Sequence, residues 1–430
     1  MIDYLSKNFI EKVVSMIKAN TQPALGCTEP VAVAFTSAVV SKYFKWELES
    51  LRIAVSKNIF KNGKSVIVPG TKQAGLDLAG ALGFFGGDSD KEFMVLEDIN
   101  EEDVNKAVGF IERDKVEQFM VEDVPDVYVK CTAEGEGHKV VAITANGHVS
   151  LKSVNVDDKP IFAKDEVASA LDSIDGLKTL NLSQMREIVE KVDMEDIGFI
   201  KKGIERNILA AKEGLSKNYG LGVGKTIQGL VNRGKLELDI ARKARMMTAA
   251  AADMRMGGGN CEVITSGGSG NQGIGVMVTT AMVGREFGVD EQKITRAAFF
   301  GDLMNSYVKL YAGKLSGMCG CAIGAGIGAA AGVTWMLGGT DEEIAGACNN
   351  MFANITGMIC DGAKDTCSLK LATSAEESVI AALLALDGCV VRPGIGIVGR
   401  DVEETIKNVG MLSKKGFNKV DDTIIEIIGG

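Results

Sequence analysis

The feature that most constrains this chain is an uncharged run from Met318 to Leu337 that is rich in glycine and alanine. The run is long enough to cross a bilayer as a helix, but its small side chains gain little free energy on transfer into lipid. Small side chains also let neighbouring helices approach closely. The run therefore predicts a helix buried inside the protein, within a helical bundle, and no membrane partner.

Composition and charge narrow the class of protein. The chain has 430 residues, of which 46% are hydrophobic and 24% charged, as in an ordinary globular protein. Its net charge of -10 repels phosphate backbones, and no basic run is interleaved with aromatic residues, so nucleic acid is excluded as a partner. Asp3, Lys7 and Glu11 interrupt the apolar residues of the N-terminus, which therefore lacks a secretory signal. A cytoplasmic location follows, where nine cysteines stay reduced as thiols.

The hydrophobic period changes twice along the chain. Residues 1–45 have the period of two helices, and residues 46–160 contain strand-like runs such as Ser65–Val68 and the alternating stretch Val127–Val156. The period is helical again over residues 161–430. The sequence predicts an α+β fold: a mainly helical domain, on which the first helices pack, with an inserted smaller α/β domain.

Two pairs of cysteines in the C-terminal half could bind a metal. Cys360 and Cys367 flank a segment that contains glycine, and Cys319 and Cys321 lie upstream. Thiolates are soft ligands, and three or four together suit either zinc or an iron–sulfur cluster. The two histidines of the chain lie in the β-rich segment, so three thiolates would leave one coordination position open for a reacting molecule.

A further cysteine, Cys27, directly precedes the second predicted helix. Thr28 suits the N-cap of this helix and Pro30 suits its first turn. The Cys27 thiol is then expected near the positive end of the helix dipole, where its pKa falls and the thiolate is favoured. Cys27 could equally be a small apolar residue beneath a loop, and the motif alone leaves both interpretations open.

The glycine-rich segment Ser266–Gly273 is followed by the apolar residues of another helix. Its backbone N–H groups could form a cradle for an anion, either a substrate carboxylate or a cofactor phosphate. A flexible turn between packed helices is the alternative.

Taken in order, these motifs resemble the L-cysteine desulfidase family, which is related to the alpha chain of iron–sulfur L-serine dehydratases. The resemblance extends from Cys27 to about Gly388, and its carriers are Leu25–Pro30, Lys61–Gly63, Pro69–Thr71, Ser266–Gly273, Leu315–Cys321 and Met358–Cys367. It implies an oxygen-sensitive enzyme that converts L-cysteine into pyruvate, ammonia and hydrogen sulfide with a [4Fe-4S] cluster.

The resemblance also implies roles for individual residues. The cluster would be held by Cys319, Cys360 and Cys367, although the serine dehydratases have a longer gap between their last two ligands. Alignment of residues 322–324 with the dehydratase pattern favours Cys319 over Cys321 as the first ligand. Cys27 would remove the α-proton while the open iron binds the substrate sulfur. The residues expected to bind the substrate carboxylate are Ser266, Ser269 and Asn271.

Three other functions fit the same residues. Serine dehydration could use the same machinery, with a hydroxyl in place of the thiol at the iron. A pyridoxal-phosphate lyase could use the glycine-rich segment, but no lysine is a compelling partner for a Schiff base. A non-catalytic protein could use zinc to staple the helical half. The sequence leaves the oligomeric state open, a homo-oligomer included.

Overall fold

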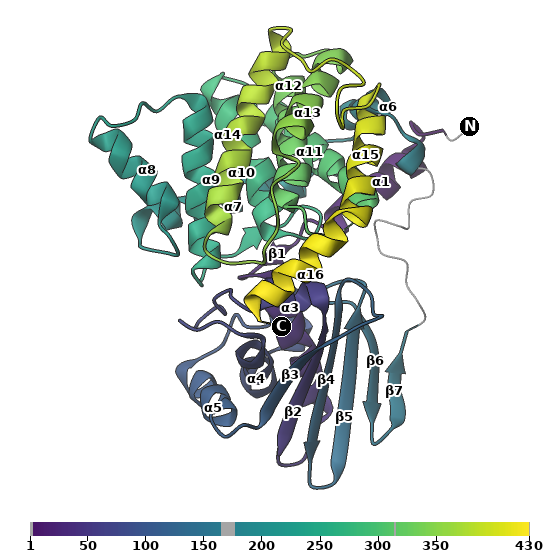
Figure 1. Cartoon of the computed structure of the whole chain (residues 1–430), viewed down its shortest axis with the longest axis vertical. Helices are drawn as coiled ribbons and strands as arrows, with labels where there is room; N and C mark the ends of the chain where they lie inside the picture. The colour runs from purple at the N-terminus through teal and green to yellow at the C-terminus, as the bar shows by residue number, and fades with distance from the viewer. Residues whose placement is uncertain (1–2, 165–176, 314, 430) are drawn as a thin grey trace.

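A computed structural model of the chain describes residues 3–164, 177–313 and 315–429. It contains a helical half and a half built on a β-sheet (Figure 1). The α+β class predicted from the sequence is therefore confirmed. Residues 165–176, at the start of the segment predicted as helical, lie outside the described residues.

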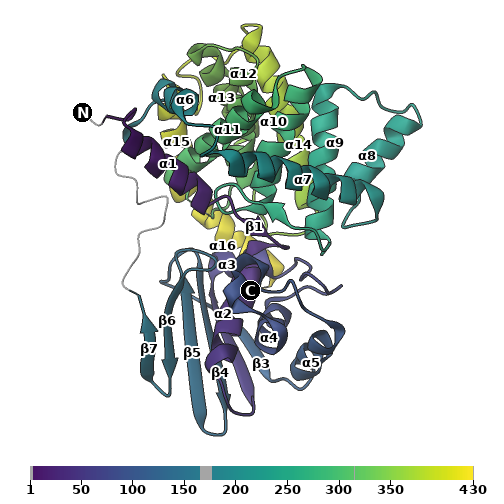
Figure 2. The same ribbon diagram turned by 180° about the vertical axis from the view of Figure 1, so that it is seen from behind.

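The sheet half is built on six strands in the order β3-β2-β4-β5-β6-β7. Its elements are α2 (Thr28–Tyr43), β2 (Ser50–Ser56), α3 (Lys57–Gly63), α4 (Leu76–Gly86), η1 (Ser89–Met94), α5 (Glu101–Ile111), β3 (Val116–Val121), β4 (Tyr128–Gly135), β5 (His138–Ala145), β6 (Leu151–Val156) and β7 (Lys159–Ala163). Strands β2 and β3 are parallel, and the other neighbours are antiparallel. Helices α2, α4 and α5 pack on the sheet (Figure 2).

The strand predictions for this half are confirmed in one place and wrong in another. The alternating stretch Val127–Val156 forms the antiparallel strands β4, β5 and β6, as predicted. The run Ser65–Val68 forms no strand and makes only an isolated bridge between Ile67 and Ala74. The turn at Pro69 and Gly70 reverses the chain before this run can pair with the sheet.

The helical half contains the remaining elements. They are α1 (Lys7–Ala19), β1 (Pro23–Ala24), η2 (Leu177–Thr179), α6 (Leu182–Lys191), α7 (Gly198–Ser216), α8 (Val223–Asn232), α9 (Ile240–Met256), β8 (Val263–Ile264), α10 (Gly270–Glu286), α11 (Glu291–Ala312), the π-helical turn η3 (Cys321–Gly326), α12 (Ile327–Met336), α13 (Asp341–Ile355), α14 (Cys367–Leu386), α15 (Val402–Lys415) and α16 (Phe417–Ile428).

The uncharged run forms η3 and α12 at the centre of this half, as predicted. A Cβ atom added at Gly328 would lie 2.3 Å from the carbonyl oxygen of Gly301 on α11, so the two helices touch through their glycine backbones. Close approach of this kind requires small residues. Among the described residues, no helix is long and apolar enough to cross a membrane.

The two N-terminal helices belong to different halves, which corrects the expectation that residues 1–45 pack together on the helical domain. Helix α1 packs in the helical core through Val13 and Ile17. Helix α2 packs in the sheet core through Val33 and Val40. The difference follows from their surfaces, because α1 has one apolar stripe whereas α2 is buried on every side over most of its length. The sheet half therefore begins near Thr28.

Two of the contacts between the described parts of the halves lie near the middle of the molecule. Strand β1 pairs with β8 and ties the segment before α2 to the glycine-rich segment. Helix α16 extends from the helical half to α3 (Figure 1), where Asp421 forms a buried ion pair with Lys61. The Nζ atom of Lys64 also donates to the carbonyl oxygen of Ile428 at 2.7 Å.

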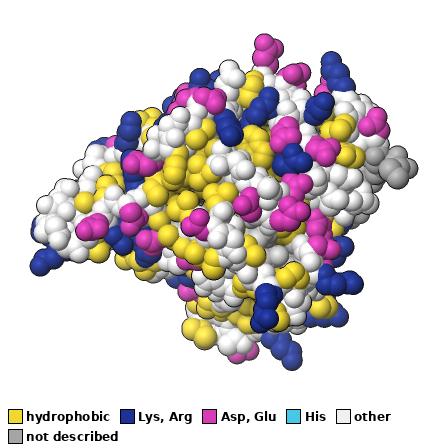
Figure 3. Space-filling model, turned by 90° about the horizontal axis from the view of Figure 1, so that it is seen from above, with side chains coloured by type: hydrophobic (Ala, Val, Ile, Leu, Met, Phe, Trp, Pro, Cys, Tyr) yellow, Lys and Arg dark blue, Asp and Glu magenta, His cyan; other side chains and the backbone are white. Residues whose placement is uncertain are grey.

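Apolar side chains also gather on the outer surface of the helical half. Seen from above, an apolar patch lies among charged side chains (Figure 3). The exposed apolar residues of this half include Ile380, Leu384 and Val390. Large patches of this kind mark contacts between proteins. A homo-oligomer stays a prediction.

Candidate functional site

Five of the nine cysteines line one cavity of about 110 Å³ between the two halves: Cys27, Cys319, Cys321, Cys360 and Cys367. A short antiparallel bridge joins the two cysteine-bearing loops of the helical half. In this bridge the Cys319 N–H donates to Met358 O at 2.8 Å, and the Cys360 N–H donates to Gly317 O at 2.7 Å. The structure thus brings together the three predicted cluster ligands, with Cys321 beside them.

The loop from Cys360 to Cys367 is held against helix α3 of the sheet half. Gly362 has a φ of +96°, and a Cβ atom there would lie 2.3 Å from the carbonyl oxygen of Lys61. Only glycine combines this backbone conformation with so close an approach. The Cys360 Sγ lies 4.0 Å from Asn62 Oδ1. The loop that carries Cys360 and Cys367 therefore packs against α3, which carries the Lys61–Gly63 motif.

Charged groups surround the thiols. The Nζ of Lys364 lies 2.8 Å from Asp361, and Lys370 pairs with the same carboxylate. Burial opposes ionisation of Asp361, but these two lysines lower its pKa to about 2. A hydrogen bond with Cys321 lowers the pKa of Cys319 to about 7, whereas burial raises the pKa of Cys367 to about 12. A metal bound here would have to displace protons from the thiols.

The donor set of the cavity fits an iron–sulfur cluster. Within the part of the chain that is described, no three His, Cys, Asp or Glu side chains come close enough together to ligate a single metal ion. A zinc ion needs all its sulfur ligands at about 2.3 Å from one point. A four-iron cluster is several times wider and takes thiolates that stand further apart. Thiolates are the usual protein ligands of such clusters, and four thiols of the helical half line this cavity.

Cys27 reaches the cavity from the sheet half as the N-cap residue of α2. Gly26, with a φ of +69°, turns the chain over Pro69 just before it. The Cys27 thiol is 3% exposed and donates to Glu29 Oε2 at 2.8 Å. Burial and the Glu29 charge raise the pKa of Cys27 well above its usual value, and the nearby charge of Arg255 offsets this only in part. The expected fall of this pKa through the helix dipole is wrong, because desolvation outweighs the dipole.

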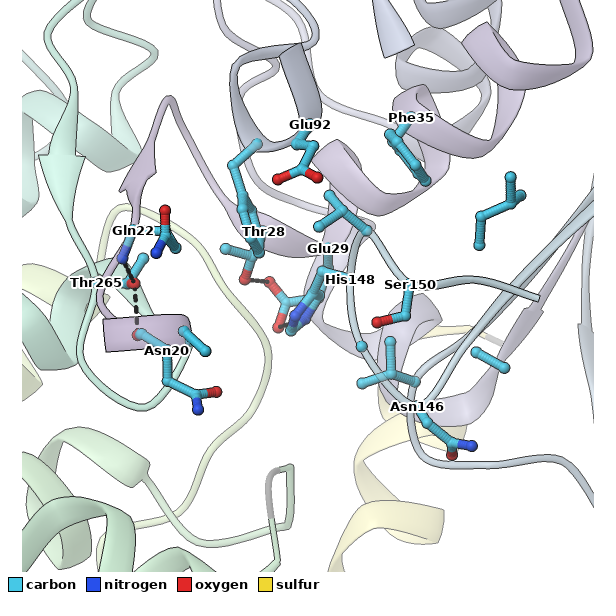
Figure 4. A pocket seen from close by; sticks show the side chains of 18 of the residues that line it. Asn20, Gln22, Thr28, Glu29, Phe35, Glu92, Asn146, His148, Ser150 and Thr265 are labelled. Carbon is cyan, nitrogen blue, oxygen red and sulfur yellow. Dashed lines mark hydrogen bonds and ion pairs between the residues drawn. The ribbon is translucent and has the colours of Figure 1, made fainter. Parts of the chain in front are cut away.

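Glu29 is a buried carboxylate with a partner on each oxygen. Asn62 Nδ2 donates to Oε1 at 3.0 Å, while Oε2 accepts from Cys27 and from the Thr28 hydroxyl at 3.2 Å. The His148 Nε2 atom lies 3.9 Å from Oε1 (Figure 4). Burial alone would raise the pKa of Glu29, but the charge of His148 and the hydrogen bonds from Cys27 and Asn62 lower it. Glu29 is therefore an ionised proton acceptor in contact with the Cys27 thiol.

The glycine-rich segment lies on the other side of the cavity, and its three predicted substrate ligands are placed differently. Ser269 is the N-cap residue of α10 and lines the cavity. Asn271 also lines the cavity, but its Oδ1 accepts from Arg255 at 3.0 Å. Ser266 is fully buried, and its hydroxyl accepts from Asn305 Nδ2 at 2.8 Å. Ser266 therefore stabilises the loop from beneath in this structure.

A larger cavity of about 710 Å³ adjoins the small one, and Glu29, Ser269 and Gln272 line both. Figure 4 shows Glu29 and His148 on its wall, between the helical half and the turn that joins β5 to β6. The exposed side chain of Lys152 lies at its margin. The larger cavity thus gives a small molecule a route from solvent to the cysteines.

Sequence reasoning missed Glu29, Asn62, His148 and Arg255 as members of the site. Glu29 and Arg255 had a usable signal, because each is a charge next to a long apolar or alanine-rich stretch, where burial is expected. Asn62 and His148 had no such signal. They are distant from Glu29 in the sequence and approach it through the folding of the sheet half.

Comparison with known proteins gives a consistent result. The family described as "Serine dehydratase alpha chain" matches residues 90–426. A protein of Clostridium botulinum (strain Okra / Type B1), named "UPF0597 protein", is 48% identical over 425 residues, which cover 98% of each chain. A UPF0597 protein of Clostridioides difficile (strain 630) is 35% identical, and the match covers 96% of this chain and 98% of the relative. A UPF0597 protein of Desulfatibacillum aliphaticivorans is 36% identical, and the match covers 97% of each chain.

Proposed function

Because the chain belongs to the serine dehydratase alpha chain family, a family of lyase-type enzymes, we propose that it is an iron–sulfur L-cysteine desulfidase. The proposed reaction converts L-cysteine into pyruvate, ammonia and hydrogen sulfide. The observation that carries the proposal is the convergence of Cys27 with four other cysteines on one small cavity. The Leu25–Pro30 motif, which carries Cys27, is one of the motifs that resemble the desulfidases.

The proposed cofactor is a [4Fe-4S] cluster held by Cys319, Cys360 and Cys367. With three protein ligands, such a cluster supplies a Lewis acid at the iron that has no protein ligand. Cys321 remains the alternative first ligand, because it lines the same cavity as Cys319. A zinc staple is less well supported, because among the described residues no group of three ligands converges as a single ion requires.

The chain's own residues supply the proton transfer. Cys27 is a thiol at rest, and its proton is already hydrogen-bonded to the ionised Glu29. We propose that Glu29 takes this proton as substrate binds and that the Cys27 sulfur then removes the substrate α-proton. The electron pair of the C–H bond forms the C=C bond as the C–S bond breaks. The departing sulfide receives the proton from Glu29, which restores the resting state.

The remaining chemistry needs no further group from the protein. The aminoacrylate product tautomerises to an imine, which water hydrolyses to pyruvate and ammonia. Cys27 and Glu29 are both buried, so the proton that they share is shielded from bulk water until elimination is complete.

Serine is the second candidate substrate, because the matched family is named for serine dehydratases. Serine would lose water in place of hydrogen sulfide and would need the same α-proton transfer to Cys27.

The test is to purify the protein without oxygen and to measure iron, inorganic sulfide, zinc and products. We expect about four irons and four sulfides per chain, with pyruvate and hydrogen sulfide formed in equal amounts from L-cysteine. A larger kcat/KM for L-serine than for L-cysteine would make the protein a serine dehydratase. Protein that contains zinc alone and forms no pyruvate from either amino acid would overturn the proposal.

A further inference from the structure

Arg255 is a buried cation that the proposed proton transfer does not use. It lies in the last turn of α9, is 3% exposed and lines the cavity of the five cysteines. One guanidinium nitrogen, Nη1, donates to Asn271 Oδ1 at 3.0 Å and lies 3.4 Å from the Met256 sulfur. The Nε atom has no hydrogen-bond partner. Among the described residues, no carboxylate forms an ion pair with Arg255.

A buried guanidinium with unused hydrogen-bond donors is stabilised when an anion binds beside it. Burying a charge is costly unless an opposite charge or several hydrogen bonds compensate. The carbonyl end of α9 provides part of that compensation through the helix dipole. A guanidinium has five N–H donors in a planar fork, however, and one amide oxygen and a thioether leave most of them unused.

A second donor group lies against the guanidinium. Helix α10 begins at Gly270, and its N-cap residue Ser269 makes no side-chain capping bond. In the described part of the chain, the N–H groups of Gly270, Asn271 and Gln272 have no acceptor. A Cβ atom at Gly270 would lie 2.4 Å from Arg255 Nε, so the absence of a side chain at Gly270 leaves room for the guanidinium.

We infer that Arg255 and the first turn of α10 together form a carboxylate-binding site for the α-carboxylate of a small amino acid. This assignment rests on the proposed function for the choice of an amino acid. In this site the main contact to the carboxylate comes from Arg255, whereas the sequence had suggested the Asn271 side chain. Asn271 instead orients the guanidinium by accepting its hydrogen bond. The cavity of about 110 Å³ restricts the ligand to a small molecule. Arg255 and Cys27 line the same cavity, so a carboxylate held by Arg255 shares that cavity with the Cys27 thiol.

Two thiol probes test this site in the holoenzyme. 3-Mercaptopropionate carries a thiol and a carboxylate, and cysteamine carries a thiol and an amine but no carboxylate. Their dissociation constants are measured by calorimetry without oxygen for the wild type, Arg255→Gln and Arg255→Lys. The matched control is Arg245→Gln, since Arg245 lies on the same helix but pairs with Glu376 outside the cavity.

For 3-mercaptopropionate we expect Arg255→Gln to weaken binding about ten- to a hundredfold, the usual effect of losing a charged hydrogen-bond partner. Cysteamine binding should change less than threefold. Arg255→Lys should lie between the wild type and Arg255→Gln for 3-mercaptopropionate, because lysine keeps the charge but loses the fork. If Arg255→Gln does not fold, the Arg255→Lys comparison decides the same question.

The outcomes separate this site from the proposed function. An equal loss for both probes, or no loss for either, overturns the carboxylate assignment even if the enzyme releases hydrogen sulfide from cysteine. A loss confined to 3-mercaptopropionate in a protein without lyase activity supports the carboxylate site and overturns the proposed function alone.

Discussion

The two halves of the molecule contribute different chemistry to the same cavity. The helical half contributes the soft ligands Cys319, Cys360 and Cys367 together with the Arg255 cation. The sheet half contributes the Cys27 thiol, the Glu29 carboxylate to which it donates, and Asn62, which donates to the same carboxylate. In the proposed function, binding of the cofactor and transfer of the proton are therefore located on different elements. A substitution in the sheet half should therefore leave cofactor binding by the helical half measurable.

The largest effect is expected from the helical side. Cys360→Ala or Cys367→Ala leaves two thiolates for the proposed cluster, so iron, sulfide and lyase activity should all be lost. Iron and sulfide analysis of protein purified without oxygen measures this. Cys348→Ala, which removes a buried thiol of the same half that lies outside the cavity, is the control and should keep the full iron content. A full cluster in Cys360→Ala would show that the ligand assignment is wrong.

A second comparison tests whether Cys319 or Cys321 is the first ligand of the proposed cluster. Cys319→Ala should lower the iron content more than Cys321→Ala, because the hydrogen bond from Cys321 favours the thiolate of Cys319. The same metal analysis measures both variants side by side. The opposite ranking would make Cys321 the first ligand.

On the sheet side, Cys27→Ser should keep the cluster and lose turnover. A serine hydroxyl is far too weakly acidic to replace the thiol, and a positioned base contributes a factor of about a hundred to ten thousand in rate. The kcat for cysteine and the iron content, measured on the same sample, give the two readouts. Near-normal kcat would exclude Cys27 as the base, and loss of iron would make it a ligand.

Glu29→Gln should have a smaller effect on turnover, about ten- to a hundredfold, because Cys27 itself remains. The Glu29 charge raises the pKa of Cys27, so its removal should lower that pKa and speed the alkylation of Cys27 near neutral pH. Peptide mass spectrometry after brief iodoacetamide treatment measures the alkylation. Slower turnover with faster alkylation supports the Cys27–Glu29 pair. If turnover instead rose with the thiolate population, Cys27 would act as a base without Glu29.

The smallest effect is expected on stability, from a second buried carboxyl. Its pKa is raised, whereas the pKa of Glu29 is lowered. Asp302 of the helical half accepts from the Thr21 hydroxyl at 3.4 Å, and its Oδ1 atom has no hydrogen-bond partner. Burial raises the pKa of Asp302 to about 7, above the value of about 3.9 in an unfolded chain. The folded state therefore binds this proton more tightly, and the carboxyl lowers stability increasingly as pH rises from about 4 to about 7.

Asp302→Asn removes this penalty. The free energy of unfolding should rise by about 2 kcal/mol more at pH 8 than at pH 5.5, as obtained from the pKa difference. Urea unfolding at the two pH values, with the wild type in parallel, measures the difference. An equal change at both values would show that Asp302 does not titrate in this range.

Much of the fold and part of the site could be predicted from the sequence, for physical reasons. The small uncharged residues of the run Met318–Leu337 favour close packing, so the local pattern was enough to predict a buried helix. The alternation of Val127–Val156 favours paired strands, so the local pattern was also enough to predict β-structure there. The softness of thiolate ligands suggested that the two pairs of cysteines group together, and the family resemblance implied the set Cys319, Cys360 and Cys367. The structure places all three on one cavity.

The rest depends on contacts between distant segments. The pKa of Cys27 is raised because Glu29 and the surrounding core desolvate it, which the helix dipole alone does not reveal. Cys27 and Glu29 reach the four cysteines of the helical half only where the two halves meet. The packing of α2 on the sheet also depends on its partner, since a helix that is apolar on all sides fits either core.

The contact between α16 and α3 has a practical consequence for handling the protein. Lys64 donates to the carbonyl oxygens of Ile428 and Gly429 at 2.7 and 2.8 Å, and α3 carries Asn62 beside the proposed catalytic pair. A bulky group attached near the end of α16 would crowd this contact and disturb the position of Asn62. A purification handle belongs instead before α1, whose start lies on the outer side of the helical half (Figure 1).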